Sequence, residues 1–408
     1  MHRESGGDDD DDERKTSTPE NATVPDIVCQ TDQKKQDEIR SACAEADIRE
    51  LQRLAESAGG FLTDSLRQLA WPILLGVPAP RTNLNNEPPP KSDDDGGGWK
   101  ELPRHRDEDQ VQLDVNRSFV YYPHDLSDSD LERRRSQLSA LISEVLRTCP
   151  YLCYFQGYHD ICQVFLLVLQ PAWAARCVTR LSVLRIRDFM LPNLGPTTAQ
   201  LRLLPDILGC ADPALRRHIA TIEPFYALAG TLTMYAHNIE AYHDIARLFD
   251  VLLAREPVFS IYMFAQIVVD RRDEIFDIDE PDLLQVILAR VPANMDLDSL
   301  IARSVTLYAR CPPSTLPAWR RISRASALKT ARDAQHAAGQ TLQDGAAFFD
   351  EQSKELQWLD LRNSVLSVMW AYRRPAKALG MAVAVGLVAF YVRRNPTLLS
   401  SIASFFAK

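Results

Sequence analysis

Apolar residues recur at helical spacing along most of this chain. The clearest case is an amphipathic helix that ends before Pro150, whose apolar positions follow the i, i+3, i+4 pattern: Leu138, Leu141, Ile142, Val145 and Leu146. Ser127 with Asp130 three residues later is typical of a helix start, and Pro150 predicts the end of the helix.

The same period predicts helices in most other parts of the chain. Two helical stretches are expected within residues 36–77, the second at Leu66–Leu75, where Pro72 interrupts the pattern. Beyond residue 160 we expect helices at 161–169, 172–184, 198–208, 214–221, 226–237, 241–253, 259–269, 283–290 and 297–308. Strand-like alternation between turn residues is nearly absent, so the pattern predicts an all-α fold.

Three segments depart from this pattern. Residues 1–35 carry the acidic run Asp8–Asp12 and few apolar residues, which predicts a disordered tail. Residues 78–108 contain runs of proline, aspartate and glycine, which predict a flexible insertion. Residues 317–375 are rich in Ala, Arg, Gln and Asp and predict a helical stalk, whose more apolar last part docks on the domain or lies on a membrane.

The C-terminal region holds an uncharged apolar run at Ala378–Val392. As a helix this run is about 22 Å long, short of a hydrocarbon core of about 30 Å. Arginine pairs at 373–374 and 393–394 bracket the run, and lysine or arginine at such ends can reach the membrane surface. We therefore predict a transmembrane tail anchor at 376–394 and a short tail at 395–408. A buried soluble helix and a re-entrant hairpin are the alternatives.

Composition and charge exclude several classes of function. The chain has 408 residues, 46% hydrophobic and 25% charged, which is ordinary for a globular protein, and its net charge of −9 gives no reason to expect nucleic acid as a partner. His237 and His243 lie six residues apart, a poor spacing for a metal site, so we expect structural histidines and no metal. The acidic N-terminus is unlike a signal peptide. Buried, reduced thiols are expected for the eight cysteines, which form no Cys-x-x-Cys pair: 29, 43, 149, 153, 162, 177, 210 and 311.

Three short motifs stand in order around the amphipathic helix. They are Arg67-x-x-x-Trp71-x-x-Leu-Leu-Gly, then Asp114-x-x-Arg117, and then Tyr154-x-Gln156-Gly157. In this order, and with a helix between the last two, they resemble the fingerprint motifs of TBC domains, which are GTPase-activating proteins for Rab-family small GTPases. The resemblance covers roughly residues 40–316. It implies a helical fold of two subdomains over 36–316.

The resemblance also implies a mechanism. Arg117 would be an arginine finger, which supplied in trans to a GTPase contributes roughly 10³ to 10⁵ in rate, and its planar guanidinium suits phosphate oxygens better than lysine does. Gln156 would be a second finger that orients the attacking water. The GTP and magnesium would belong to the Rab, so the chain would need no cofactor of its own. Taken singly, Arg117 could be an ordinary ion-paired arginine and Gln156 a capping residue.

The remaining motif residues would support these two fingers. By resemblance, Asp114 would aim the guanidinium, and Tyr154 and Gly157 would shape the turn that presents the glutamine. Asp160 would hold the local backbone or an ion pair. Arg67 and Trp71 would chiefly support the fold.

The extension Tyr-x-Gln-Gly-Tyr-His-Asp at 154–160, together with the C-terminal apolar run, resembles a tail-anchored subgroup of TBC proteins. That subgroup is associated with the Rab of endoplasmic reticulum to Golgi traffic, which predicts a place on the endoplasmic reticulum or early Golgi membrane with the domain in the cytosol. A catalytically inactive, membrane-anchored Rab-binding scaffold is the main alternative, and a purely structural tail-anchored protein is a second. An independent hydrolase is disfavoured because no Gly-x-Ser-x-Gly, His-Glu-x-x-His or P-loop pattern occurs.

Overall fold

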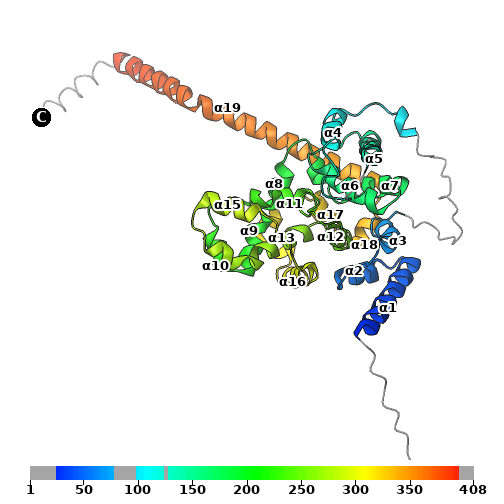
Figure 1. Cartoon of the computed structure of the whole chain (residues 1–408). Helices are drawn as coiled ribbons and strands as arrows, with labels where there is room; N and C mark the ends of the chain where they lie inside the picture. The colour runs from blue at the N-terminus through cyan, green and yellow to red at the C-terminus, as the bar shows by residue number, and fades with distance from the viewer. Residues whose placement is uncertain (1–23, 78–97, 124–126, 395–408) are drawn as a thin grey trace, which may run out of the picture.

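The computed structural model describes residues 24–77, 98–123 and 127–394, and within these it describes all side chains except those of 24–31, 368–380 and 392. This part of the chain is built of α-helices and short 3-10 helices without a strand, so the predicted all-α fold is confirmed (Figure 1). In chain order the elements are α1 (Val24–Glu45), α2 (Ile48–Glu56), α3 (Asp64–Leu74), η1 (Gly98–Glu101), α4 (Glu108–Val115), α5 (Asp128–Thr148), α6 (Tyr158–Val168), α7 (Pro171–Leu184), η2 (Arg187–Met190), α8 (Gly195–Leu201), α9 (Leu203–Ala211), α10 (Pro213–His218), η3 (Pro224–Ala227), α11 (Leu228–Leu232), α12 (Tyr242–Ala254), α13 (Phe259–Asp270), α14 (Arg272–Phe276), α15 (Pro281–Ala289), α16 (Leu297–Arg310), η4 (Pro313–Thr315), η5 (Pro317–Arg321), α17 (Ala327–Thr330), α18 (Ala334–Gly339) and α19 (Leu342–Arg394).

The helices form two groups around one continuous hydrophobic core. One group contains α4 to α7, and the other contains α9, α10, α13, α15 and α16 (Figure 1). Helices α3 and α12 link them, since α3 packs on α6, α7 and α12, and α12 packs on α16. The site described below lies where the first group faces α11.

The amphipathic helix predicted before Pro150 is α5. Its apolar stripe is buried as expected, and Ser127 caps its first turn by accepting a hydrogen bond of 3.2 Å from the backbone N–H of Asp130. The helix ends at Thr148, two residues before Pro150. A capping signal and a clear period were sufficient here because both act within one helix.

Two predicted helices are wrong in their extent. The helix expected at 198–208 is divided into α8 and α9 at Arg202, and the helix expected at 226–237 ends at Leu232. In the second case Met234 and Tyr235 adopt positive φ angles of 50° and 66°, which end the helix. The ring of Tyr235 is buried, and its hydroxyl donates to the backbone carbonyl of Ser260 at 2.7 Å. Tertiary packing has overridden the local pattern.

Segments predicted to be disordered or flexible are partly ordered. Residues 1–23 and 78–97 lie outside the described residues, but α1 begins at Val24, within the predicted tail. Its second half packs on α2 and α3, and extending a nucleated helix by a few turns costs little. Residues 98–108 also have a defined place, because Glu108 pairs with Arg147 at 2.6 Å and fixes this segment on α5.

The segment predicted as an exposed stalk has two parts. From Pro317 to Leu356 the chain packs against the domain and buries residues such as Ile322, Leu328 and Phe349, so the packed unit extends beyond residue 316. Leu356 still packs against the core, whereas the described side chains beyond it are exposed, and α19 extends away from the domain (Figure 1). Among the described residues, no helix has a long enough apolar stretch to cross a membrane, so the transmembrane span predicted at 376–394 is not confirmed.

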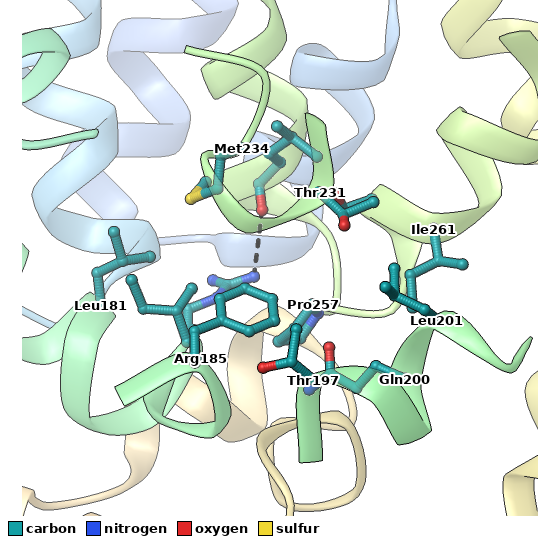
Figure 2. Close-up of a pocket in the computed structure, with 13 residues that line it drawn as sticks. Leu181, Arg185, Thr197, Gln200, Leu201, Thr231, Met234, Pro257 and Ile261 are labelled. Carbon is teal, nitrogen blue, oxygen red and sulfur yellow. Dashed lines mark hydrogen bonds between the residues drawn. The ribbon is translucent and has the colours of Figure 1, made fainter. Parts of the chain in front are cut away.

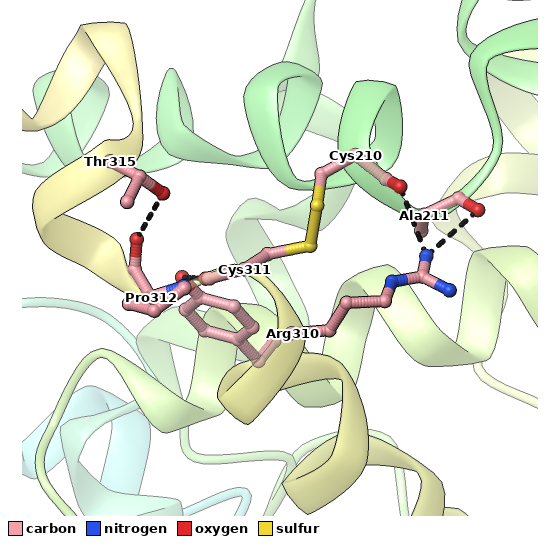
Figure 3. The surroundings of a disulfide bond; sticks show 7 residues. Cys210, Ala211, Arg310, Cys311, Pro312 and Thr315 are labelled. Atoms are coloured by element: carbon pink, nitrogen blue, oxygen red, sulfur yellow. Dashed lines mark hydrogen bonds between the residues drawn. A yellow bond between two sulfur atoms is a disulfide. The ribbon is translucent and has the colours of Figure 1, made fainter.

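Two of the eight cysteines are joined, which corrects the expectation that all are reduced thiols. Cys210 at the end of α9 and Cys311 after α16 form a disulfide with a Cα–Cα distance of 6.4 Å (Figure 3). Beside it, Arg310 donates to the carbonyls of Cys210 and Ala211, both at 3.0 Å. The pairing was not predictable because 101 residues separate the two cysteines. The free cysteines in the described structure are buried, apart from the half-buried Cys153.

Candidate functional site

Arg117 projects from the turn that ends α4. Its guanidinium donates to Asp114 Oδ1 at 2.6 Å, and the Arg117 side chain is 54% exposed whereas that of Asp114 is only 1% exposed. Asp114 is held in turn by Gln110, whose amide donates to Oδ1 at 3.1 Å. A fixed, buried carboxylate therefore holds one side of an arginine whose remaining donors face solvent.

The loop between α5 and α6, residues 149–157, presents Gln156, and we call it the glutamine loop. Gly157 ends the loop with a φ of +99°, a conformation that favours glycine. A Cβ at this position would lie 2.6 Å from Thr233 Cγ2, so a side chain is also excluded by space. The loop is joined to α4 by Tyr154, whose hydroxyl donates to Asp114 Oδ2 at 2.9 Å. Gln156 itself is exposed.

The two sequence motifs meet in one cleft of about 580 Å³. Arg117 and Gln156 line it from one side, and Thr233 and His237 from the segment after α11 line it too. Aromatic and aliphatic side chains complete the lining, among them Phe119, Val120, Tyr121, Phe155 and Leu232. The cleft thus combines a cation and an amide with an apolar surround, an arrangement suited to the polar group of a macromolecular partner.

A chain of polar contacts runs behind the two exposed residues, and two histidines in it were not singled out as functional from the sequence. His159 Nδ1 lies 3.2 Å from the Tyr154 hydroxyl, and His159 Nε2 lies 3.2 Å from Asp160 Oδ1. Asp160 Oδ2 lies 3.1 Å from His237 Nδ1. Asp160, for which a role in the local backbone or an ion pair was predicted, thus contacts both histidines. His237, which was expected to be a structural histidine, has a side chain that is 62% exposed and lines the cleft.

The protonation state of His159 decides how many of these contacts can be hydrogen bonds, because each needs one hydrogen. Three contacts link Asp114, Tyr154, His159 and Asp160, but the tyrosine hydroxyl and a neutral imidazole supply only two hydrogens. Burial lowers the pKa of His159, against the opposing effect of the two carboxylates. The pKa of His237 is instead raised by its hydrogen bond to Asp160. Protonation of His159 would therefore complete the chain of contacts.

Arg67 and Trp71 lie outside the cleft, in a buried cluster around Asp250 of α12. Arg67 Nε donates to Asp250 at 3.0 Å and Trp71 Nε1 at 2.9 Å. The backbone N–H of Phe61 donates to the same carboxylate at 3.0 Å. The cluster joins α3 to α12, and the supporting role of Arg67 and Trp71 stays a prediction.

A second cavity, of about 30 Å³, lies among α7, α8 and α13 (Figure 2). Thr197 Oγ1 and Ser260 Oγ line it without a hydrogen-bond partner, and this volume admits about one water. Arg185 borders it and donates to the Leu253 carbonyl at 2.7 Å, and burial lowers the pKa of Arg185 to about 10. None of the predicted site residues lies here.

A metal site is not formed by the described side chains, among which no three His, Cys, Asp or Glu residues are grouped closely enough to hold an ion. The cleft offers the exposed guanidinium of Arg117 and the exposed amide of Gln156, on two segments that the Tyr154–Asp114 hydrogen bond joins.

Comparison with known proteins identifies the class to which this fold and site belong. The model of the Rab-GTPase-TBC domain matches residues 64–276, and the chain belongs to that family. The GTPase-activating protein gyp10 of Schizosaccharomyces pombe is 33% identical over 72% of this chain and 78% of its own. Human TBC1 domain family member 20 is 34% identical over 66% of this chain and 65% of its own. The resemblance predicted from the motifs is therefore confirmed.

Solved structures agree on the fold. The Chlamydomonas flagellar RabGAP TBC domain has a TM-score of 0.50 with this chain, at 14% sequence identity, and 70% of this chain and 93% of that one are covered. The Ypt/Rab-GAP domain of Gyp1p gives the same TM-score and identity, covering 64% of this chain and 93% of that domain.

Proposed function

We propose that this protein stimulates GTP hydrolysis by a Rab-family small GTPase, to which it supplies Arg117 and Gln156 in trans. The observation that carries the proposal is that these two residues, 39 positions apart in the sequence, are both exposed in one cleft. Behind them, the Tyr154 hydroxyl donates a hydrogen bond to Asp114 and so joins the segments that carry them. Membership of the Rab-GTPase-TBC family gives the partner class.

The mechanism requires little chemistry from this chain. During phosphoryl transfer, negative charge spreads over the oxygens of the transferring group, and a positioned guanidinium stabilises that charge. Arg117 keeps donors for this purpose, because its hydrogen bond to Asp114 uses only Nη2 and its side chain is 54% exposed. The Gln156 amide can both donate to and accept from a water, which suits it to orient the attacking water. GTP and magnesium come with the GTPase.

Single-turnover GTP hydrolysis by a panel of GTP-loaded Rabs tests the proposal with the full chain. We expect wild type to accelerate at least one Rab, and Arg117→Ala and Arg117→Lys to lose about 10³-fold or more of the acceleration. Gln156→Ala should lose most of it as well. Arg53→Ala is the matched control, since Arg53 is also exposed and also pairs with a carboxylate three residues away, Glu50, but lies outside the cleft.

Other outcomes distinguish the alternatives. Binding of a GTP-loaded Rab without acceleration would favour the inactive scaffold. Absence of both binding and acceleration across the panel would refute the proposed partner class. An Arg53→Ala loss equal to that of Arg117→Ala would show that the loss is not specific to the cleft.

We further propose that the C-terminal part of α19 attaches the protein to the endoplasmic reticulum or early Golgi membrane, with the domain in the cytosol. The support for membrane attachment is a helix that extends away from the domain and exposes large apolar side chains: Met381, Val383, Val385, Leu387, Val388, Phe390 and Tyr391. The choice of compartment rests on the resemblance to the tail-anchored subgroup. Leu387→Arg should release the full chain from the membrane pellet, because a charge at the centre of the hydrocarbon core costs about 3 kcal/mol. Leu361→Arg, on the part of α19 nearer the domain, should not. Equal retention of both variants would contradict the proposal.

A further inference from the structure

The first turns of α19 pack directly against the supports of the glutamine loop. The approach is close at Gly345, where a Cβ would lie 2.3 Å from Val183 Cγ1 of α7. One turn later the buried ring of Phe349 meets the ring of Tyr151 at a centroid distance of 4.9 Å. Tyr151 belongs to the glutamine loop, five residues before Gln156. The C-terminal helix therefore touches the loop itself.

A second line of contacts reaches the same loop through η2. Gln352 of α19 is buried and donates to Asp188 Oδ1 at 3.0 Å, and Asp188 also accepts from Gln200 at 2.7 Å and from the backbone N–H of Ala327 at 2.9 Å. These bonds fix η2 from three directions. The Ser326 hydroxyl donates to the same carboxylate, so Asp188 joins η2 to α8, α17 and α19.

The residues at the other end of η2 hold the loop. The backbone N–H of Cys153 donates to the Met190 carbonyl at 2.8 Å, and the Phe155 and Phe189 rings pack edge to face at 6.1 Å. Cys153 and Phe155 lie three and one residues before Gln156. Thus one route from α19 passes through Phe349 and Tyr151, and the other through Gln352 and η2, and both end on the loop.

We propose that the docked turns of α19, Leu342–Leu356, position the glutamine loop, so that Gln156 is in place only while the C-terminal helix is docked. Phe349 and Gln352 are the positioning residues. The inference deepens the proposed function and rests on it for the role of Gln156. Because α19 continues from the docked turns to Arg394, the helix connects its far end to the glutamine loop. The C-terminal helix is then a regulator of the site as well as an extension from it.

Hydrogen–deuterium exchange of the full chain tests the coupling without any GTPase. We expect Phe349→Ala to accelerate exchange of the peptide covering 149–157 about tenfold, with the Cys153 amide most affected. Leu361→Ala, at an exposed position of the same helix, is the control and should leave this peptide unchanged. If Phe349→Ala disturbs the overall fold by circular dichroism, Gln352→Met replaces it, since it keeps the side-chain length and removes only the donor to Asp188. Unchanged loop exchange in a folded variant overturns the inference.

A hydrolysis assay then tests the link to Gln156. In single-turnover reactions Phe349→Ala should lower the maximal stimulated rate about tenfold with little change in the concentration giving half of it. In a Gln156→Ala background the same change should cause no further loss, since it acts through the residue already removed. An equal loss in both backgrounds overturns the positioning role. If the wild-type chain accelerates no Rab, the proposed function fails, and the exchange result still decides whether α19 holds the loop.

Discussion

The buried cluster around Asp250 allows the most quantitative prediction. The side chain of Asp250 is fully buried, and it accepts hydrogen bonds from Arg67, Trp71 and the backbone of Phe61 at 2.9 to 3.2 Å. Asp250→Ala leaves the guanidinium of Arg67, which is 4% exposed, with only the partly exposed Asp64 as its partner. Breaking a buried ion pair by removing one member costs about 3 to 5 kcal/mol. We expect a loss of that size, a large part of the roughly 5 to 15 kcal/mol typical of a folded domain.

Urea unfolding followed by tryptophan fluorescence measures the loss, and Trp71 reports from inside the cluster. Asp250→Asn should lose less, because the amide oxygen still accepts a hydrogen bond and the volume is unchanged. The control is Asp273→Ala, which removes a carboxylate that is 98% exposed and pairs with Arg272 at 3.4 Å. It should change stability by at most about 1 kcal/mol. A loss below about 1 kcal/mol for Asp250→Ala, or one equal to that of the control, would refute the reasoning.

Three further predictions concern acid stability, the disulfide and the glutamine loop. The hydrogen bond from Arg147 lowers the pKa of Glu108 to about 2, so the stability that its charge contributes is present above its ordinary pKa of about 4.5 and is lost as pH falls toward 2. Glu108→Gln should therefore reduce the slope of unfolding free energy against pH between these two values. An unaltered slope would contradict this. Reduction of the Cys210–Cys311 disulfide, or Cys210→Ser, should lower the free energy of unfolding by about 2 to 4 kcal/mol. Equal unfolding midpoints with and without reductant would show that the disulfide does not contribute to stability. Gly157→Ala should reduce the stimulated rate of GTP hydrolysis to that of Gln156→Ala. Adding Thr233→Ser removes the methyl group that would clash with the new Cβ and should restore part of this rate. If the rate is not restored, the positive φ of residue 157 is the sole cause of the loss.

Interactions within a few residues made much of this protein predictable from its sequence. The period of α5, its Ser127 cap and the absence of strand patterns follow from local propensity and from one buried face. The Asp114–Arg117 contact is local too, because three residues on a helix turn bring the side chains together. The motifs around Arg117 and Gln156 were sufficient to predict the family, whose domain model then matched.

Contacts between distant segments were decided only by the tertiary structure. Asp160 meets His237 across 77 residues, Cys210 meets Cys311 across 101, and the end of the 226–237 helix depends on where Tyr235 packs. The contact between the rings of Phe349 and Tyr151 also joins segments that are distant in the sequence. Sequence spacing carries no information on such pairs, because they depend on how whole helices pack against one another. The sequence alone therefore determined that the fold is helical, where most helices lie and which two residues are candidates for the fingers. The packing of those helices decided where some of them end and which residues contact the two candidates.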